Sequence, residues 1–248
     1  MDSLKQFFDE NPKVALGFSG GVDSSYLLYA GVHYGAKIRP YYIKTAFQPQ
    51  FELDDAKRLC AELGVEMTVI ELDILSNTVV AANPSDRCYY CKTELFGALK
   101  KRAVEDGYRV LIDGTNASDD AGDRPGMRAL TEMEVRSPLR ECGITKPEVR
   151  RLSKEAGLFT WDKPAYACLA TRIPSGKQIT AEVLSQVEMA ENALFALGFT
   201  DFRVRVLEGM ARIQVPSGQM AKMIEMREEV CGAVGKHFKG VMLDLAGR

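Results

Sequence analysis

The chain has 248 residues, of which 46% are hydrophobic and 27% charged, and its formal net charge is −2. This composition is typical of a soluble globular protein with one large domain or two of ordinary size. The slight acidity gives no support for a nucleic-acid-binding surface, which normally carries a basic excess. The amino terminus lacks the apolar core of a signal peptide, and no apolar run approaches the roughly 20 residues that span a bilayer. We therefore expect a cytoplasmic protein that has neither nucleic acid nor a membrane as a partner.

The first two thirds of the chain alternate between strand and helix patterns. After a short amphipathic helix over residues 4–9, strands are predicted at 14–18, Lys37–Lys44, Val65–Leu72, Arg109–Ile112 and Val135–Leu139. Helices are predicted between them, at 26–35, Glu52–Leu63, Thr93–Asp106 and Lys146–Gly157, the last with a capping box formed by Thr145 and Glu148. This alternation predicts an α/β fold, a Rossmann-like parallel sheet with helices on both faces.

The pattern changes near residue 178. Residues 159–178 are rich in Pro, Gly and aromatic side chains and predict a long loop, which in a compact chain is usually functional or disordered. Beyond it we expect a helix at 181–197, strands at Phe202–Leu207 and Arg212–Val215, a helix at 218–236 and a strand at Val241–Leu245. The sequence therefore predicts two domains, residues 1–178 and a smaller α+β domain over 179–248 for substrate binding or oligomerisation.

A phosphate-binding loop is predicted between the first strand and the next helix, in Ser19-Gly20-Gly21-Val22-Asp23-Ser24-Ser25. Glycines let the backbone approach a phosphate, and the free N–H groups and dipole of the following helix favour an anion. A Walker A loop is excluded because it requires a lysine that this segment lacks. Asp23 is instead our candidate for binding a bridging Mg²⁺ ion. The candidate nucleotide-binding residues are Ser19, Gly20, Gly21, Asp23, Ser24 and Ser25.

A second polar segment, Gly114-Thr115-Asn116, follows the strand that is predicted to end at Ile112. Ligands of open parallel sheets bind at the carboxyl ends of the strands, so this segment and the glycine loop should meet at one edge. Gly114, Thr115 and Asn116 are therefore candidate contacts to the nucleotide, as is Asp119, although turn chemistry accounts for Asn and Asp there nearly as well.

Three of the six cysteines stand in positions that indicate chemistry. Cys88-Tyr89-Tyr90-Cys91 is a C-x-x-C pair, which alone fits a redox pair, half of a zinc site or part of an iron–sulfur site. Cys168 lies in the predicted long loop near Arg172, where a cysteine with a lowered pKa can be a nucleophile or a metal ligand. For Cys60, Cys142 and Cys231 we expect simple packing or surface positions.

These motifs together resemble known proteins. The loop at 19–24 resembles the PP-loop of the ATP pyrophosphatase superfamily, which cleaves ATP between its α- and β-phosphates. The whole chain is similar to the LarE family, ATP-dependent sulfur transferases that help to build the nickel-pincer nucleotide cofactor of lactate racemase. The segments that carry this resemblance are 19–24, Arg87–Lys92, Asp113–Asp119, Arg124–Gly126, Arg136–Leu139, Ala167–Pro174 and Leu243–Leu245.

The resemblance implies a reaction and its cofactors. One carboxylate of pyridinium-3,5-biscarboxylic acid mononucleotide would be adenylated by ATP with Mg²⁺, releasing pyrophosphate, and then converted to a thiocarboxylate. In one branch of the family a cysteine matching Cys168 gives up its own sulfur and becomes dehydroalanine. In the other branch three cysteines hold a 4Fe–4S cluster whose fourth iron is free to carry sulfur, and the count of Cys88, Cys91 and Cys168 favours this branch. The family also implies a homo-oligomer, a trimer-based hexamer.

Three arginines are candidate substrate contacts. Arg172 lies close to Cys168 in sequence and would bind phosphate or carboxylate, although a solvated surface position is equally compatible with the sequence. Arg205 and Arg212 fall on the predicted strands of the small domain. A basic face there would hold the mononucleotide phosphate, or it would be an ordinary solvent-exposed face.

Other functions remain open at this stage. A tRNA thiolase also pairs a PP-loop with a C-x-x-C and a distant third cysteine, and a salt-sensitive affinity for tRNA would favour it. An ammonia-using synthetase, as in NAD or GMP synthesis, would leave three cysteines without a role. A non-catalytic ATP-binding regulatory module would not release pyrophosphate.

Overall fold

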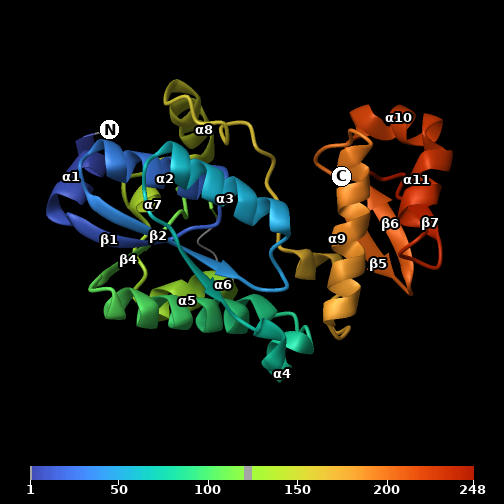
Figure 1. Cartoon of the computed structure of the whole chain (residues 1–248), viewed down its shortest axis with the longest axis horizontal. Coiled ribbons are helices and arrows are strands. Elements are labelled where there is room, and N and C mark those ends of the chain that lie inside the picture. Colours follow the sequence, from blue (N-terminus) through green and yellow to red (C-terminus); the bar gives the residue numbers. More distant parts are fainter. Residues whose placement is uncertain (1, 120–124) are drawn as a thin grey trace. The chain divides into compact units, whose positions relative to one another are not determined.

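The structure, a computed structural model, describes residues 2–119 and 125–248 (Figure 1). The chain forms two compact units, each described here by itself. Unit 1 comprises residues up to Thr45, Gln50–Ile74 and Asp86–Lys163, and unit 2 comprises Ala46–Pro49, Leu75–Ser85 and Pro164–Arg248. The expected boundary near residue 178 thus falls inside unit 2, because the segment that follows Lys163 packs with the carboxyl-terminal part of the chain.

Unit 1 is built on a four-stranded parallel sheet of order β3-β2-β1-β4. The strands are β1 (Lys13–Gly17), β2 (Lys37–Lys44), β3 (Thr68–Glu71) and β4 (Val110–Asp113). The predicted α/β fold is therefore confirmed. The chain moves outward from β1 to β2 and β3 and then returns to place β4 on the other side of β1. This reversal creates a topological switch point between β1 and β4, where ligands of such sheets bind.

Both faces of this sheet are covered by helices, as Figure 1 shows. Val14 and Leu16 of β1 pack in the larger core, and Ala15 between them packs in the smaller core against Leu99 of α5, as the period-two alternation of a strand requires. The larger core takes residues from α1 (Asp2–Glu10), α2 (Val22–His33), α3 (Gln50–Glu62) and α8 (Lys146–Glu155), and the smaller core from α5 (Arg87–Glu105).

Two sequence predictions for unit 1 are wrong. The strand predicted at Val135–Leu139 is only an isolated bridge from Ile112 to Arg136, because Pro138 starts the short helix α7 (Pro138–Glu141). The helix predicted to begin at Thr93 begins at Arg87 instead, so the cysteine pair lies on a helix and not in a loop. Helix α6 (Pro125–Glu132) packs against this longer α5.

Unit 2 carries the predicted α+β elements. Helix α9 (Ala181–Ala196) packs on a three-stranded sheet in which β5 (Arg203–Leu207) runs antiparallel to β6 (Met210–Gln214), and β6 runs parallel to β7 (Val241–Leu243). The helix predicted at 218–236 is divided into the 3-10 helix η3 (Ser217–Gln219), α10 (Met220–Glu225) and α11 (Arg227–Val234).

The first half of the chain and the predicted long loop add short elements to unit 2. These are α4 (Thr78–Ala81), η2 (Leu169–Arg172) and the part of η1 (Ile74–Ser76) that follows Ile74, since Ile74 itself belongs to unit 1. Backbone hydrogen bonds join them: Leu169 N donates to the Phe47 carbonyl, and Ile179 N donates to the Ala81 carbonyl. Within residues 2–119 and 125–248, no helix is both long and apolar enough to cross a membrane.

We predict that Leu194→Ala will lower the free energy of unfolding of unit 2 by about 2–5 kcal/mol, because the fully buried Leu194 side chain would leave a cavity. Leu245→Ala is the matched control, because Leu245 is 83% exposed and its truncation should change stability by less than about 0.5 kcal/mol. Urea unfolding followed by circular dichroism measures both. Equal effects of the two changes would mean that α9 does not form this core.

Candidate functional site

The predicted phosphate-binding loop connects β1 to α2 at the carboxyl edge of the sheet. Its two serine hydroxyls brace it: Ser19 Oγ lies 3.1 Å from Ser24 Oγ and accepts a hydrogen bond from Gly21 N at 3.3 Å, and Ser24 Oγ donates to the Gly21 carbonyl at 3.2 Å. Gly21 is the N-cap of α2 and has no side chain to satisfy the first N–H groups of the helix. The loop therefore presents backbone donors to an anion at the positive end of a helix dipole.

Glycine is required at two positions of this site. Gly20 has a φ of +71°, and a Cβ there would lie 3.1 Å from the Glu52 carbonyl oxygen of α3. Gly114, which follows β4, is more restricted, since a Cβ would lie 2.7 Å from Ser24 N. The backbone after β4 therefore packs directly on the first turn of α2.

The predicted residues after β4 meet the loop as expected from the switch point. Asn116 Nδ2 donates to Asp23 Oδ1 at 3.2 Å. Buried Asp113 shapes this turn, because its carboxylate accepts from Thr115 N, Thr115 Oγ1 and Ser137 Oγ. Asp119 accepts from Asn116 N and closes the turn. Ser25, also predicted, faces the core: its hydroxyl is buried and finds no hydrogen-bond partner among the described residues.

Two lysines that sequence reasoning missed also contact this site. Lys146, the first residue of α8, places Nζ 2.5 Å from Asp23 Oδ2. Lys163, at the end of unit 1, places Nζ 3.3 Å from the Gly20 carbonyl and 2.7 Å from Asp55 Oδ2. The one available signal was the capping box of α8, which is confirmed and fixes where the helix begins. Which loop that helix end approaches is decided by the fold alone.

The donor set at Asp23 suits Mg²⁺. This ion prefers hard oxygen ligands and is usually bound by one or two carboxylates together with substrate phosphates. Asp23 offers one half-buried carboxylate in the first turn of α2, next to the phosphate-binding N–H groups. Its present partners, Lys146 and Asn116, hold it in place.

Cys88 and Cys91 lie on the first turns of α5 in unit 1. Three residues apart on a helix, they share one face, and Cys88 is exposed while Cys91 is half-buried. Tyr89 between them donates to Glu132 of α6 at 2.6 Å, and the guanidinium of Arg128 lies 4.1 Å from its ring centre. These contacts fix the helix start that carries the two cysteines, and a C-x-x-C pair of this kind can supply ligands to a metal or a cluster.

Cys168 belongs to unit 2, where it is the N-cap of η2 and is half-buried. Its carbonyl accepts from Thr171 N at 3.0 Å and Thr171 Oγ1 at 2.9 Å. Among residues 2–119 and 125–248, no three His, Cys, Asp or Glu side chains form a metal-binding group. The assignment of Cys88, Cys91 and Cys168 as cluster ligands stays a prediction.

The remaining cysteines occupy the packing or surface positions that were predicted for them. Cys60 is buried in the larger core, and this burial raises the pKa of its thiol to about 12. Cys142 is half-buried and Cys231 is exposed.

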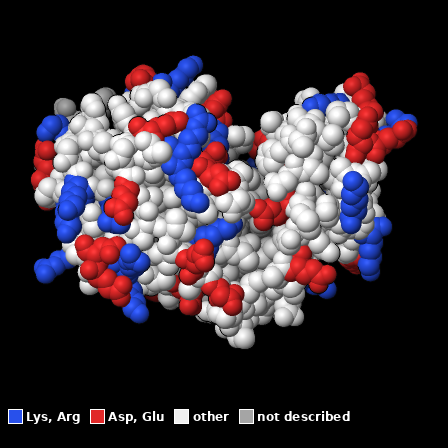
Figure 2. Space-filling view, in the orientation of Figure 1, with Lys and Arg blue, Asp and Glu red and all other residues white. Residues whose placement is uncertain are grey.

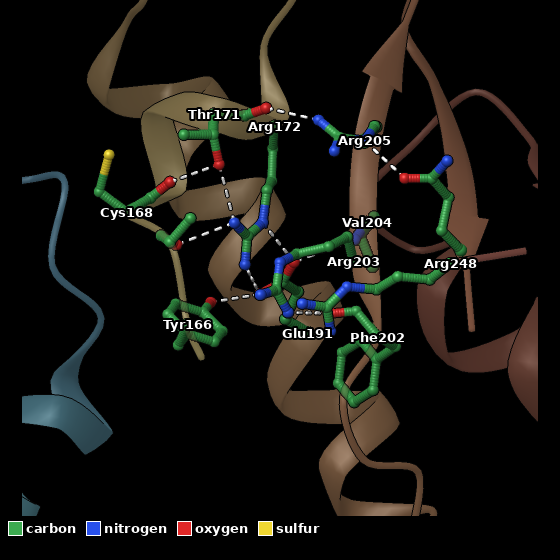
Figure 3. A network of polar contacts seen from close by, with 12 residues as sticks. Tyr166, Cys168, Thr171, Arg172, Glu191, Phe202, Arg203, Val204, Arg205 and Arg248 are labelled. Atoms are coloured by element: carbon green, nitrogen blue, oxygen red, sulfur yellow. Dashed lines mark hydrogen bonds and ion pairs between the residues drawn. The ribbon is translucent and has the colours of Figure 1, made fainter. Parts of the chain in front are cut away.

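Arg172 does not occupy the solvated position that the sequence allowed. It is fully buried and paired with buried Glu191, donating from Nε to Oε1 at 2.8 Å and from Nη2 to Oε2 at 3.1 Å (Figure 3). Its Nη1 donates to the Ala167 carbonyl at 2.8 Å and to Thr171 Oγ1 at 2.9 Å. Arg172 therefore holds the Cys168 segment on α9, and contact with substrate remains a prediction.

Arg205 and Arg212 face each other across β5 and β6. Arg205 donates to Gln214 Oε1 at 2.6 Å and to the Thr171 carbonyl at 2.8 Å, whereas the half-exposed Arg212 lies 3.7 Å from Asp244. Arg203, two residues before Arg205, is buried and donates to the Ala165 carbonyl at 2.5 Å.

Arg124, part of a motif that carried the resemblance, lies outside the described residues.

The chain is similar to several known proteins, although no protein-family model matches it. It is 38% identical to an uncharacterized protein of Synechocystis sp., over 100% of this chain and 94% of that protein. It is 32% identical to pyridinium-3,5-bisthiocarboxylic acid mononucleotide synthase of Lactiplantibacillus plantarum, over 95% of this chain and 86% of that enzyme. The chain belongs to the LarE family.

A more distant relative of this chain supports the reaction class. The chain is 27% identical to the tRNA-specific 2-thiouridylase MnmA of Pseudothermotoga lettingae, over 67% of this chain and 58% of that enzyme. Both named relatives are sulfur-inserting enzymes, and the MnmA relative shares the PP-loop superfamily fold. This LarE-family chain is accordingly an ATP-dependent sulfur-transferring enzyme, and the resemblance found in its motifs is confirmed.

We predict that Gly114→Ala will destabilise unit 1 by about 1–3 kcal/mol and weaken ATP binding at least tenfold, because the added methyl would displace the backbone of Ser24. Thermal unfolding and calorimetric titration with ATP measure the two effects. Gly232→Ala in α11 is the control, since a Cβ there meets nothing within 4 Å and the change should be neutral or slightly stabilising. Unchanged ATP affinity in Gly114→Ala would place the nucleotide elsewhere.

Proposed function

We propose that the chain adenylates a carboxylate of pyridinium-3,5-biscarboxylic acid mononucleotide and replaces one carboxylate oxygen by sulfur. The observation that carries this proposal is the glycine loop at the β1–β4 switch point, with Asp23 in the first turn of α2, in a member of the LarE family. The L. plantarum relative is named for the bisthiocarboxylic acid product of such a reaction.

The adenylation step needs donors around the phosphates of ATP. A substrate carboxylate oxygen attacks the α-phosphorus, and the bond to the β-phosphate oxygen breaks with release of pyrophosphate. In this proposal the N–H groups in the first turn of α2 and the Ser19 and Ser24 hydroxyls beside them donate to the phosphate oxygens, and Gly21 N is released from Ser19 Oγ to join them. Asp23 would hold Mg²⁺, which neutralises phosphate charge when bound. Thr115 and Asn116 border this site and would contact the adenylate.

The sulfur-transfer step would use the three predicted cysteines. A sulfur nucleophile attacks the acyl-adenylate carbonyl and displaces AMP, which leaves the thiocarboxylate. Cys88 and Cys91 present two accessible thiols on one helical face, and Cys168 would be the third ligand of a 4Fe–4S cluster that supplies sulfur when bound. Without a cluster, Cys168 itself would attack and displace AMP to form a thioester; loss of its Cα proton with cleavage of the Cβ–S bond would then release the thiocarboxylate and leave dehydroalanine.

The distribution of charge favours a small-molecule substrate over tRNA. On the face shown in Figure 2, basic side chains alternate with acidic ones and form no continuous basic stripe, and the net charge of the chain is −2. A nucleic-acid surface would concentrate Lys and Arg on one face. A cytoplasmic location, maturation of lactate racemase and assembly as a trimer-based hexamer are part of the same proposal.

The adenylation proposal predicts that pyrophosphate will be released only when both ATP and the biscarboxylate mononucleotide are present. Asp23→Asn should lower the rate of release by about 10²-fold, because the ion that neutralises the phosphates loses its charged ligand. Asp9→Asn is the matched control, since among the described residues exposed Asp9 pairs only with Lys5 on α1. Equal rates in the two variants would remove Asp23 from the proposed site.

The cluster proposal predicts about four iron atoms and four sulfides per chain after anaerobic purification, the content of one 4Fe–4S cluster. Cys88→Ala should lose them, whereas Cys231→Ala, another exposed cysteine, should retain them. Iron and acid-labile sulfide assays with the visible spectrum make the measurement. If careful reconstitution loads no iron on the wild-type chain, the cluster is excluded, and mass spectrometry after turnover should then find dehydroalanine at position 168.

A further inference from the structure

Lys163 brings a positive charge to a phosphate-binding loop that has no lysine of its own. Its Nζ lies 3.3 Å from the carbonyl oxygen of Gly20 in the loop and 2.7 Å from Asp55 Oδ2 on α3. The side chain is only 14% exposed, and Nζ lies 5.6 Å from the ring centre of Phe51. The ammonium is therefore held at the loop and not in bulk solvent.

The main chain of Lys163 is fixed as well. Arg150 of α8 donates from Nη2 to the Lys163 carbonyl at 2.9 Å and from Nη1 to the Trp161 carbonyl at 2.8 Å. Lys163 N donates to the Thr160 carbonyl at 3.1 Å. Because both the backbone and the ammonium are already positioned, binding an anion at the loop would cost this lysine little additional conformational entropy.

The partners of Lys163 are ones that a phosphate group can replace. An ammonium has three N–H donors, and the described residues give it one carboxylate and one neutral carbonyl at a long distance. Asp55 is 33% exposed, so water reaches the carboxylate side of this ion pair and partly screens it. A terminal phosphate carries more charge than a carboxylate and forms strong charge-assisted hydrogen bonds with an ammonium.

The charge balance around the loop also calls for a cation. Asp23, Asp55 and Asp119 all take part in the contacts of this region, and ATP would add about four negative charges. Lys146 is occupied by Asp23, at 2.5 Å. Of these two described lysines, Lys163 is the one that contacts the backbone of the glycine loop itself, through the Gly20 carbonyl.

We propose that Lys163 binds the β- and γ-phosphates of ATP, exchanging Asp55 and the Gly20 carbonyl for phosphate oxygens. The lysine of a Walker A loop lies within the loop and binds the β- and γ-phosphates. Lys163 would bind the same groups, although it lies 143 positions along the chain from Gly20 of the loop. It stabilises the negative charge of the departing pyrophosphate. This inference rests on the proposed function, since it requires that the loop bind ATP.

Calorimetric titration with two nucleotides tests this role. One is an ATP analogue with a methylene group between the α- and β-phosphates, in the presence of Mg²⁺, and the other is AMP, which lacks the groups that Lys163 would bind. Lys163→Met should lower the affinity for the analogue about tenfold to a hundredfold and the affinity for AMP by less than about threefold. Lys163→Arg, which keeps the charge, should restore most of the affinity for the analogue.

Two further variants complete the test. Lys154→Met is the matched control, because Lys154 contacts the ring of Trp161 in the same region of the chain, and analogue binding should be unchanged. Asp55→Asn frees Lys163 from its carboxylate and should leave analogue binding unchanged or tighter. If Asp55→Asn lowers the affinity for the analogue as much as Lys163→Met does, the ion pair between Lys163 and Asp55 only stabilises the structure of the loop, and the proposal is overturned.

The remaining outcomes separate this inference from the proposed function. If Lys163→Met binds the analogue as tightly as the wild-type chain, or if its affinity for AMP falls as much as its affinity for the analogue, Lys163 is not a phosphate ligand although the loop still binds nucleotide. If the wild-type chain binds neither nucleotide, the proposed function and this inference are both overturned.

Discussion

The proposed nucleotide site depends on one close backbone contact, between Gly114 after β4 and Ser24 in the first turn of α2. A side chain at position 114 would lie 2.7 Å from Ser24 N, so only glycine permits the two segments to touch. The contact arises because β1 and β4 are adjacent and parallel and both end at the same edge of the sheet. It brings Asn116 within hydrogen-bond distance of Asp23. The first N–H groups of α2 have no partner within the helix and are available to a ligand at the loop.

Unit 2 depends on a different interaction, the buried ion pair between Arg172 and Glu191. Burial by itself would lower the pKa of Arg172, but the hydrogen bonds and charge of Glu191 raise it above its usual value, so the guanidinium stays ionised. Glu191 also accepts from Val204 N at 2.9 Å and from the Tyr166 hydroxyl. A buried carboxylate of this kind is tolerated because donors surround it. In return it fixes the segment that carries Cys168 to α9 and β5.

Cys168 and the Cys88–Cys91 pair are held in place in different ways. Cys168 is positioned through backbone carbonyls that accept hydrogen bonds from Arg172 and Thr171. Cys88 and Cys91 are positioned by helix geometry, with Tyr89 joined to α6 by Glu132 and Arg128. Both arrangements fix the main chain of the segment that carries the cysteines.

The sequence by itself determined the class of the fold, the glycine loop and the family, because these follow from local patterns: apolar periodicity, glycine spacing and short motifs. It placed β2 at Lys37–Lys44 and recognised the capping box of α8. It did not anticipate that Arg172 is buried, that the cysteine pair lies on a helix, or that Ala46–Pro49 and Leu75–Ser85 join unit 2. Nor did it find Lys146 and Lys163, which are 123 and 143 residues from their partners in the loop region. Those features depend on which segments pack together, and only the tertiary structure decides contacts between residues so far apart in the chain.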